Sequence, residues 1–371
     1  MLNLEDIIEE GLQQGASDIH IICGLKPVYR ITKALLPSKF PVVTEDDIYG
    51  FYDFIVNGNV EYDEQFKKDR RLDCAIAYKD VRLRVNVSFM DNVPLFTLRI
   101  IKNTLPRFED LGVPDVIRRM TYQPQGVILV TGKTNSGKTT TLNCLINDIN
   151  ENQNRKILTL EAPVEYKHKT KKSIIVQKEV GPGADSLNFH DGVRNALRED
   201  CDILVIGEIR DKETMAAAID MAESGHLVIG TLHTKSCAET LDRIINFYDF
   251  SDQAQIKVLM AALLRIIVSQ RLIPGKDGDS LVMVPEVMVV DNVVAGCIRK
   301  EKFSVSEIED AIQSSSNKGS QGLITVLADL FINDKITLEQ AQAQIEEKNY
   351  GKGARQGSFF KNVFSCSWGR N

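Results

Sequence analysis

The sequence predicts an α/β protein whose larger part is built on a mostly parallel sheet, preceded by a smaller domain with a sheet of its own. Three observations support this. From Leu111 onward, short apolar runs of strand length alternate with helical patterns, as βαβ units do. The first hundred residues instead contain several consecutive strand-like runs. A chain of 371 residues is also too long for one ordinary core and suits two or three domains.

The composition is ordinary for a globular protein and argues against membrane-spanning, secreted and generally nucleic-acid-binding proteins. Hydrophobic residues make up 43% and charged residues 26% of the chain, and no apolar run approaches the length of a membrane span. The N-terminus lacks the basic-then-apolar pattern of a secretory signal. Seven cysteines without paired spacing indicate the reducing cytoplasm. A net charge of −6 gives no general attraction to nucleic acid.

Residues 1–101 are expected to form the N-terminal domain. A helical pattern runs from Asn3 to Gly15, and Thr44 resembles a helix N-cap followed by acidic residues. Strands are predicted at Asp18–Cys23, Leu72–Tyr78, Val81–Phe89 and Leu95–Ile101. Within the third of these, Arg82, Arg84 and Asn86 alternate with apolar residues, so one face of the strand is basic and the other apolar.

Residues 102–110 have proline, charges and no period, and are expected to be a linker. The second domain then spans 111–350, and the aperiodic segment 351–371 is expected to be a mobile tail. The predicted strands of the second domain are Gly126–Thr131, Lys156–Leu160, Ile174–Gln177, Ile203–Gly207 and Leu227–Leu232. Its predicted helices are Thr139–Asn150, Phe189–Glu199, Lys212–Ser224 and Ala238–Phe247, with more helix after Asp291. Thr337 and Gln340 form a capping box at the start of the helix that runs to about Lys348.

A phosphate-binding loop follows the first strand of this domain. Residues 132–139, GKTNSGKT, fit the pattern G-x-x-x-x-G-K-[ST], with a strand before it and a helix after it. Lys138 would reach the β- and γ-phosphates of ATP and the Thr139 hydroxyl would ligate Mg²⁺. Asn135 stands where a glycine is usual, but asparagine tolerates left-handed geometry. The residues expected to bind the nucleotide are Gly132, Thr134, Asn135, Ser136, Gly137, Lys138, Thr139 and Thr140.

Two carboxylates end predicted strands of the same sheet. Glu208 follows the apolar run Ile203–Gly207, and in an open α/β sheet ligands gather at the carboxyl ends of strands, so Glu208 is the expected Mg²⁺ acid. Glu161 ends a second strand and is the best candidate for a general base or water-positioning group, with Glu165 as a weaker alternative. The competing interpretation of each is a surface or structural glutamate.

Histidines and arginines complete the candidate set. His226 and His233 flank a strand and lie roughly 20 Å apart, which excludes one shared metal. His233 either senses the γ-phosphate or is a packed or surface histidine. Arg82, Arg84 and Arg99 belong to the N-terminal domain. They are either a solvated or acid-paired face or arginines that neutralise transition-state charge from another domain or subunit.

These residues, taken in order, resemble the secretion ATPase superfamily, which powers type II/IV secretion and type IV pili. The matching segments are GASDIH (15–20), LRVN (83–86), GKTNSGKTT (132–140), LTLEAPVEY (158–166), RNALREDCDILVIGEIRD (194–211) and GHLVIGTLHT (225–234). AGCIRK (295–300) resembles the AGLIRE motif of retraction members. Within the superfamily, the chain looks like a twitching-motility retraction ATPase of the PilT type over residues 1 to about 350.

The resemblance implies a PAS-like N-terminal domain, a RecA-like ATPase domain and a hexameric ring that uses ATP and Mg²⁺. It places Glu161 at the catalytic-base position, Glu208 at the Walker B acid, and His233 at the γ-phosphate sensor with His226 beside it. Arg84 and Arg99, with Arg82 as a third, become candidates for arginines acting on a neighbouring subunit. It implies docking on a pilus platform protein at the inner face of the cytoplasmic membrane.

The sequence also departs from the family pattern. Ala162 replaces the aspartate that names one motif, which predicts a slower rate, and Lys133 replaces a usual proline. The leading hypothesis is a motor for pilus retraction. The alternatives are an assembly ATPase, a weakly hydrolysing regulatory subunit that binds ATP, and a nucleic-acid translocase, which the acidic balance disfavours.

Overall fold

The computed structural model describes residues 2–32, 34–79, 81–102, 104–181, 184–278 and 280–349, so the predicted tail 351–371 lies outside the described residues. The chain divides into two compact units. The first unit contains Met1–Thr104 together with Thr159–Lys169 and Val176–Gly192. The second unit contains Leu105–Leu158, Thr170–Ile175 and the chain from Val193 onward.

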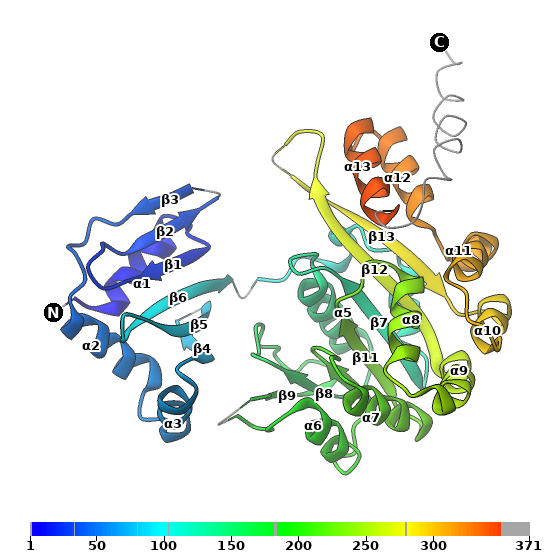
Figure 1. The fold of residues 1–371 in the computed structure, drawn as a ribbon, viewed down its shortest axis with the longest axis horizontal. Coiled ribbons are helices and arrows are strands. Elements are labelled where there is room, and N and C mark those ends of the chain that lie inside the picture. The colour runs from blue at the N-terminus through cyan, green and yellow to red at the C-terminus, as the bar shows by residue number, and fades with distance from the viewer. Residues whose placement is uncertain are drawn as a thin grey trace. The chain divides into compact units, whose positions relative to one another are not determined.

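The first unit contains a six-stranded antiparallel sheet in the order β3-β2-β1-β6-β5-β4 (Figure 1). Its strands are β1 (Asp18–Ile21), β2 (Val28–Ile31), β3 (Ala34–Pro37), β4 (Leu72–Tyr78), β5 (Val81–Met90) and β6 (Val93–Lys102). Its helices are α1 (Leu4–Gln13), α2 (Glu45–Val56) and α3 (Val60–Asp69). The predicted strands are therefore confirmed, whereas β2, β3 and α3 were not anticipated.

Strand β5 shows why this sheet forms. Leu83, Val85 and Val87 are fully buried in the core of the first unit, while Arg82 and Arg84 point to the other, partly exposed face. This alternation is the one that the sequence predicts, because successive strand residues face opposite sides of a sheet. The basic face of β5 therefore presents its arginines away from the apolar core.

A seven-stranded sheet in the order β13-β12-β7-β11-β10-β8-β9 carries the predicted loop. Its strands are β7 (Gly126–Gly132), β8 (Lys156–Glu161), β9 (Ile174–Glu179), β10 (Ile203–Ile206), β11 (Leu227–Leu232), β12 (Leu264–Pro274) and β13 (Leu281–Val289). The pairs β7/β11 and β11/β10 are parallel, as predicted; β12/β7 is also parallel, and β12/β13 is antiparallel. The β12–β13 pair was not anticipated.

Helices accompany this sheet. They are α4 (Val116–Met120), α5 (Lys138–Asn152), α6 (Phe189–Ala196), α7 (Lys212–Glu223), α8 (Cys237–Asn246), α9 (Phe250–Leu263), α10 (Asn292–Arg299), α11 (Val305–Ser314), α12 (Leu323–Ile332) and α13 (Leu338–Asn349). Single 3-10 turns lie at Phe108–Leu111 and Ser316–Lys318. Among the described residues, no helix is long and apolar enough to cross a membrane.

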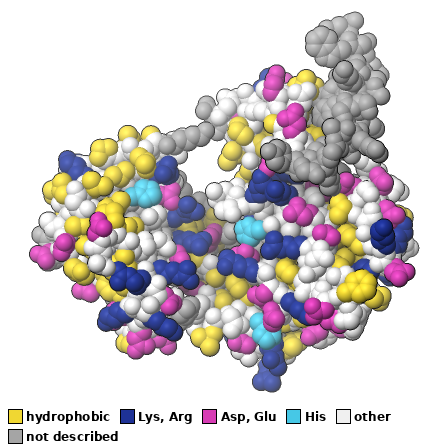
Figure 2. All heavy atoms as spheres, in the orientation of Figure 1, with side chains coloured by type: hydrophobic (Ala, Val, Ile, Leu, Met, Phe, Trp, Pro, Cys, Tyr) yellow, Lys and Arg dark blue, Asp and Glu magenta, His cyan; other side chains and the backbone are white. Residues whose placement is uncertain are grey.

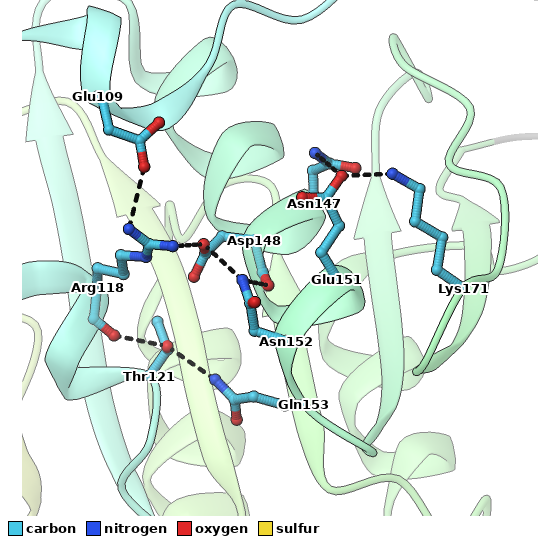
Figure 3. Close-up of polar contacts among 9 residues, drawn as sticks. All are labelled: Glu109, Arg118, Thr121, Asn147, Asp148, Glu151, Asn152, Gln153 and Lys171. Carbon is cyan, nitrogen blue, oxygen red and sulfur yellow. Dashed lines mark hydrogen bonds and ion pairs between the residues drawn. The ribbon is translucent and has the colours of Figure 1, made fainter.

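A polar network fixes the far end of α5 (Figure 3). Arg118 pairs with Asp148 at 2.5 Å and with Glu109 at 3.1 Å. Gln153, just after the helix, donates a hydrogen bond to the Thr121 hydroxyl at 3.1 Å. Because these contacts hold the C-terminal end of α5 against α4, the N-terminal end of the helix has a fixed position beside the loop that precedes it.

Replacing Arg118 with alanine is expected to lower the free energy of unfolding by about 2 kcal/mol, because the Asp148 side chain is only 7% exposed and would lose a charged partner. Denaturant titration of the full chain measures this change. Arg119→Ala is the matched control, since its pair with Asp115 spans 3.7 Å between exposed side chains and should contribute within about 0.5 kcal/mol. Equal effects of the two variants would contradict the anchoring role of Arg118.

Candidate nucleotide-binding site

The loop between β7 and α5 has the backbone that a phosphate loop requires. Gly132 (φ 148°), Gly137 (φ 87°) and Asn135 (φ 64°) all adopt positive φ. Asn135 thus takes the left-handed geometry that asparagine tolerates, as predicted. A Cβ added to Gly132 would lie 2.4 Å from the carbonyl oxygen of Gln270, so the close approach of the two strands needs glycine there.

The start of α5 forms a cradle that fits a phosphate group. Gly137 is the N-cap and supplies no capping side chain. The first-turn N–H groups of a helix have no partner inside the helix, and with the helix dipole they attract anions. The residues predicted to contact the nucleotide lie in this loop and in the first turn of α5. Thr134 and Asn135 are exposed, Ser136 is buried, and Thr139 and Thr140 are half-buried. These features fit the phosphates of a nucleotide.

Lys138 folds back over the loop. Its ammonium group donates hydrogen bonds to the carbonyl oxygens of Gly132 at 2.7 Å and Lys133 at 2.8 Å. It also lies 3.5 Å from Nδ1 of His233. The side chain is therefore already positioned on the loop, where a phosphate would compete with main-chain carbonyls for the same donor.

A chain of polar contacts links Lys138 to the acid predicted to hold Mg²⁺. Nε2 of His233 lies 3.1 Å from Oε1 of Glu208, and Arg210 donates to Oε2 of Glu208 at 2.5 Å. Glu208 follows β10 and His233 follows β11, and these two strands are parallel neighbours. The structure thus brings together Lys138, His233 and Glu208 at the carboxyl ends of adjacent strands, as the sequence predicted.

The pKa shifts of this cluster define its protonation. Burial and the nearby Lys138 charge lower the pKa of His233, although Glu208 opposes them. A neutral His233 then donates Nε2–H to Glu208 and accepts from Lys138 at Nδ1, which assigns its tautomer. Burial would raise the pKa of Glu208, but the hydrogen bond and charge of Arg210 outweigh it and hold that pKa below its ordinary value. Glu208 is therefore a carboxylate at neutral pH.

Glu161 ends β8 and is 5% exposed. Its Oε1 accepts hydrogen bonds from the Thr159 hydroxyl at 2.7 Å and from the Gln177 amide at 3.1 Å. Burial raises the pKa of Glu161, and the two hydrogen bonds only partly offset that shift. Neither Thr159 nor Gln177 was predicted from the sequence. The signal for Thr159 was available, since residues two apart on a strand share one face.

The arginines of the first unit are paired with acids of the same unit. Arg99 contacts Asp18 at 2.9 Å, Arg82 contacts Glu179 at 3.4 Å, and Arg84 lies 3.9 Å from Glu165. Arg84 and Arg99 are directly opposite one another on β5 and β6. Burial raises the pKa of Glu165, and the two arginines oppose that shift. The acid-paired interpretation thus describes these arginines within the single chain.

His226 is not part of the cluster, which corrects its predicted place beside the nucleotide. It precedes β11, and Leu227 pairs with Gly126 at the start of β7. Its carbonyl accepts from Gly126 N–H at 3.1 Å, and its Nδ1 lies 3.0 Å from the Met221 carbonyl. The phosphate loop follows the opposite end of β7, so the length of the strand separates His226 from Lys138.

Comparison with known proteins agrees with this geometry. Residues 2–356 match the family model described as "Type II/IV secretion system protein". The type IV pilus retraction ATPase PilT of Pseudomonas aeruginosa is 33% identical, over 92% of this chain and 97% of its own length. A twitching motility protein of Neisseria gonorrhoeae is 32% identical over 86% and 84% of the two chains. The pilus ATPase PilU of Pseudomonas aeruginosa is 30% identical over 94% and 90%.

Solved structures give the same result. A crystal structure of the pilus retraction motor PilT with bound ADP matches with a TM-score of 0.83 and 34% identity, over 93% of this chain and 97% of that one. The ATPase DotB of Legionella pneumophila matches with a TM-score of 0.81 and 26% identity, over 93% and 95%. The fold is accordingly a RecA-like ATPase domain with an N-terminal α+β domain. The chain belongs to the family of type II/IV secretion system proteins.

Proposed function

We propose that this protein is an ATP-hydrolysing motor that powers type IV pilus retraction. The observation that carries the proposal is the contact chain Lys138–His233–Glu208 beside an uncapped helix terminus on a phosphate loop. The similarity to PilT over nearly the whole of both chains supports the same conclusion. The chain is thus an ATPase whose work is the disassembly of a pilus.

The residues of the second unit would hold MgATP. The loop amides and Lys138 would bind the β- and γ-phosphates, and Thr139 and Glu208 would hold Mg²⁺, which would neutralise charge on the phosphates. Within the described chain, no group of three His, Cys, Asp or Glu side chains forms a metal site by itself. This fits Mg²⁺, which is usually bound by one or two protein oxygens, phosphates and water.

The remaining groups would carry out hydrolysis. Glu161 accepts a proton from the attacking water, and His233 registers the γ-phosphate through its contact with Lys138. Thr159 and Gln177 hold the Glu161 carboxylate in one orientation, which substitutes for the aspartate missing at Ala162. The rate is therefore lower than with a second carboxylate but not abolished.

The working form would be a homo-hexamer. Arg84, Arg99 and Arg82 act on the nucleotide of a neighbouring subunit after exchanging Glu165, Asp18 and Glu179 for phosphate oxygens. The hexamer docks on an inner-membrane platform protein at the cytoplasmic face of the membrane. The two predicted domains, 1–101 and 111–350 with the linker 102–110 between them, would rotate against one another during the cycle.

A weakly hydrolysing regulatory subunit that binds ATP is the second candidate, because Ala162 stands where the family motif has an aspartate. A translocase on nucleic acid is less well supported. Basic and acidic side chains are interspersed on the face shown in Figure 2, and the net charge is −6. A nucleic-acid groove normally gathers basic residues.

Three measurements test the proposal. Steady-state ATPase of the purified full-length protein separates a motor from a non-hydrolysing subunit, and turnover no higher than that of Glu161→Gln would reject the motor. DNA stimulation of that activity would favour a translocase. A deletion strain then tests direction: loss of twitching with retained or excess pili supports retraction, whereas loss of pili supports assembly.

A further inference from the structure

The second residue of the phosphate loop is joined to the last helix of the described chain. The Lys133 ammonium forms an ion pair with Oε1 of Glu347 on α13. The two side chains are 54% and 38% exposed. An exposed pair of this kind contributes little to overall stability. We therefore expect its main effect on the conformation of the phosphate loop, which contains Lys133.

Helix α13 is a firm support for this contact. Thr337 and Gln340 form the predicted capping box, with hydrogen bonds of 2.7 Å and 3.2 Å. The Gln340 amide also donates to the carbonyl of Pro274, at the end of β12, at 3.1 Å. Ala341 and Ile345 are buried in an apolar cluster shared with β12 and β13. Glu347 follows Ile345 by two residues and so projects from an anchored helix.

Strand β12, which α13 contacts, also lies next to the phosphate loop. Strand β12 pairs in parallel with β7, and its Gln270 is opposite Gly132, the first residue of the loop. The Lys133–Glu347 ion pair adds a second connection, which joins the loop to α13 through side chains. The loop is thus fixed at its base by the sheet and at its second residue by α13.

Lys133 is also the residue that shapes the loop. Its carbonyl accepts hydrogen bonds from the Lys138 ammonium at 2.8 Å and from Ser136 N–H at 3.2 Å. A movement of Lys133 would therefore displace both Lys138 and the backbone that faces the phosphate. Fixing its side chain reduces the number of loop conformations that must be lost when a nucleotide binds.

We propose that Glu347 is a positioning residue of the nucleotide site, which acts through Lys133 to hold the phosphate loop in its binding geometry. The proposal deepens the ATPase function proposed above and rests on it. It makes α13 a part of the nucleotide site, so a change in this helix alters ATP affinity without contact with the nucleotide.

The test measures KM and kcat for MgATP in the full-length protein with Glu347→Gln, Lys133→Met and the double variant. Each single variant should raise KM about two- to fivefold at low salt, the range of an exposed ion pair. The double variant should be no worse than either single one, and kcat should change less than KM. Lys133→Arg keeps the charge and should restore a near-normal KM.

Controls separate the outcomes. Glu346→Gln removes a charge from the adjacent, exposed position of α13 and should leave KM unchanged. The difference between the wild type and Glu347→Gln should disappear in high salt, which screens exposed pairs. An unchanged or lower KM in Glu347→Gln, or additive effects of the two single variants, would overturn the proposal. If the wild-type protein lacks ATPase activity, the proposed function fails instead.

Discussion

Replacing Glu161 with glutamine should reduce kcat for ATP hydrolysis by roughly a hundred- to ten-thousand-fold, the range that a positioned general base contributes. Glutamine has almost the same shape and still accepts the hydrogen bonds from Thr159 and Gln177. The loop and Lys138 are unchanged, so ATP affinity should stay within about twofold. Steady-state turnover and equilibrium ATP binding, measured on the same preparation, separate the two effects.

The matched control is Glu165→Gln, the weaker candidate for the base. The Glu165 carboxyl lies 3.9 Å from Arg84, and its pKa is raised by burial as that of Glu161 is. If Glu161 is the base, Glu165→Gln should keep most of the turnover. A reversed result, with turnover lost only in Glu165→Gln, would move the catalytic role to Glu165.

The raised pKa of Glu161 predicts a pH dependence of activity. Hydrolysis needs the carboxylate form, so kcat should fall on the acid side with an apparent pKa above the ordinary carboxyl value of 4.5. The residual activity of Glu161→Gln should lack this acid limb. A wild-type profile that is flat down to pH 4.5 would contradict Glu161 as the base.

The same shift predicts a change in stability. Because the folded-state pKa of Glu161 is raised, its contribution to stability is greatest at low pH and is lost as pH rises through that pKa. Above that pKa the wild type holds an ionised, buried carboxylate, and Glu161→Gln removes its cost. The variant should therefore melt at a higher temperature than the wild type at a pH above that pKa, with a smaller difference in acid. An active-site residue that lowers stability is a common compromise between function and stability.

The parts of the site that the sequence predicted depend on local spacing. Residues 132–139 and the acid after Ile203–Ile206 are recognisable because strand, loop and helix follow one another directly in the chain. His226 was misplaced by the family resemblance, which sets it beside His233, although the spacing alone already puts the two histidines roughly 20 Å apart, at opposite ends of a strand. The β12–β13 pair was missed, although glycines at 275 and 278 separate its two apolar strands.

Contacts between segments that are distant in the chain could not be predicted from the sequence. Nothing local indicates that Gln177 reaches Glu161, that Arg82 finds Glu179, or that Glu347 reaches Lys133. Such pairs depend on which strands and helices become neighbours, and strand order is a property of the whole fold. The chemistry of a site can thus be predicted from its motifs, whereas the residues that orient it require the structure.

The second large effect is expected at Lys138. Lys138→Ala should weaken ATP binding by about a hundredfold or more, because charge-assisted contacts to phosphate are among the strongest polar interactions and the variant loses them all. It also removes the donor that Gly132 and Lys133 share, so the loop loses its own restraint. Equilibrium binding of ATP to the full-length variant measures the loss.

Lys235→Ala is the control for Lys138, since Lys235 is an exposed lysine two residues after His233. It should bind ATP normally. Lys138→Arg is not a conservative change here, because a planar guanidinium does not fit the point between two carbonyls that an ammonium occupies. It should bind ATP nearly as poorly as Lys138→Ala. ATP affinity within twofold of the wild type in Lys138→Ala would remove the loop from the nucleotide site. If Lys138→Ala loses ATP binding while Glu161→Gln retains it, the loop is the part that binds the phosphates, and the residue at the end of β8 acts in hydrolysis.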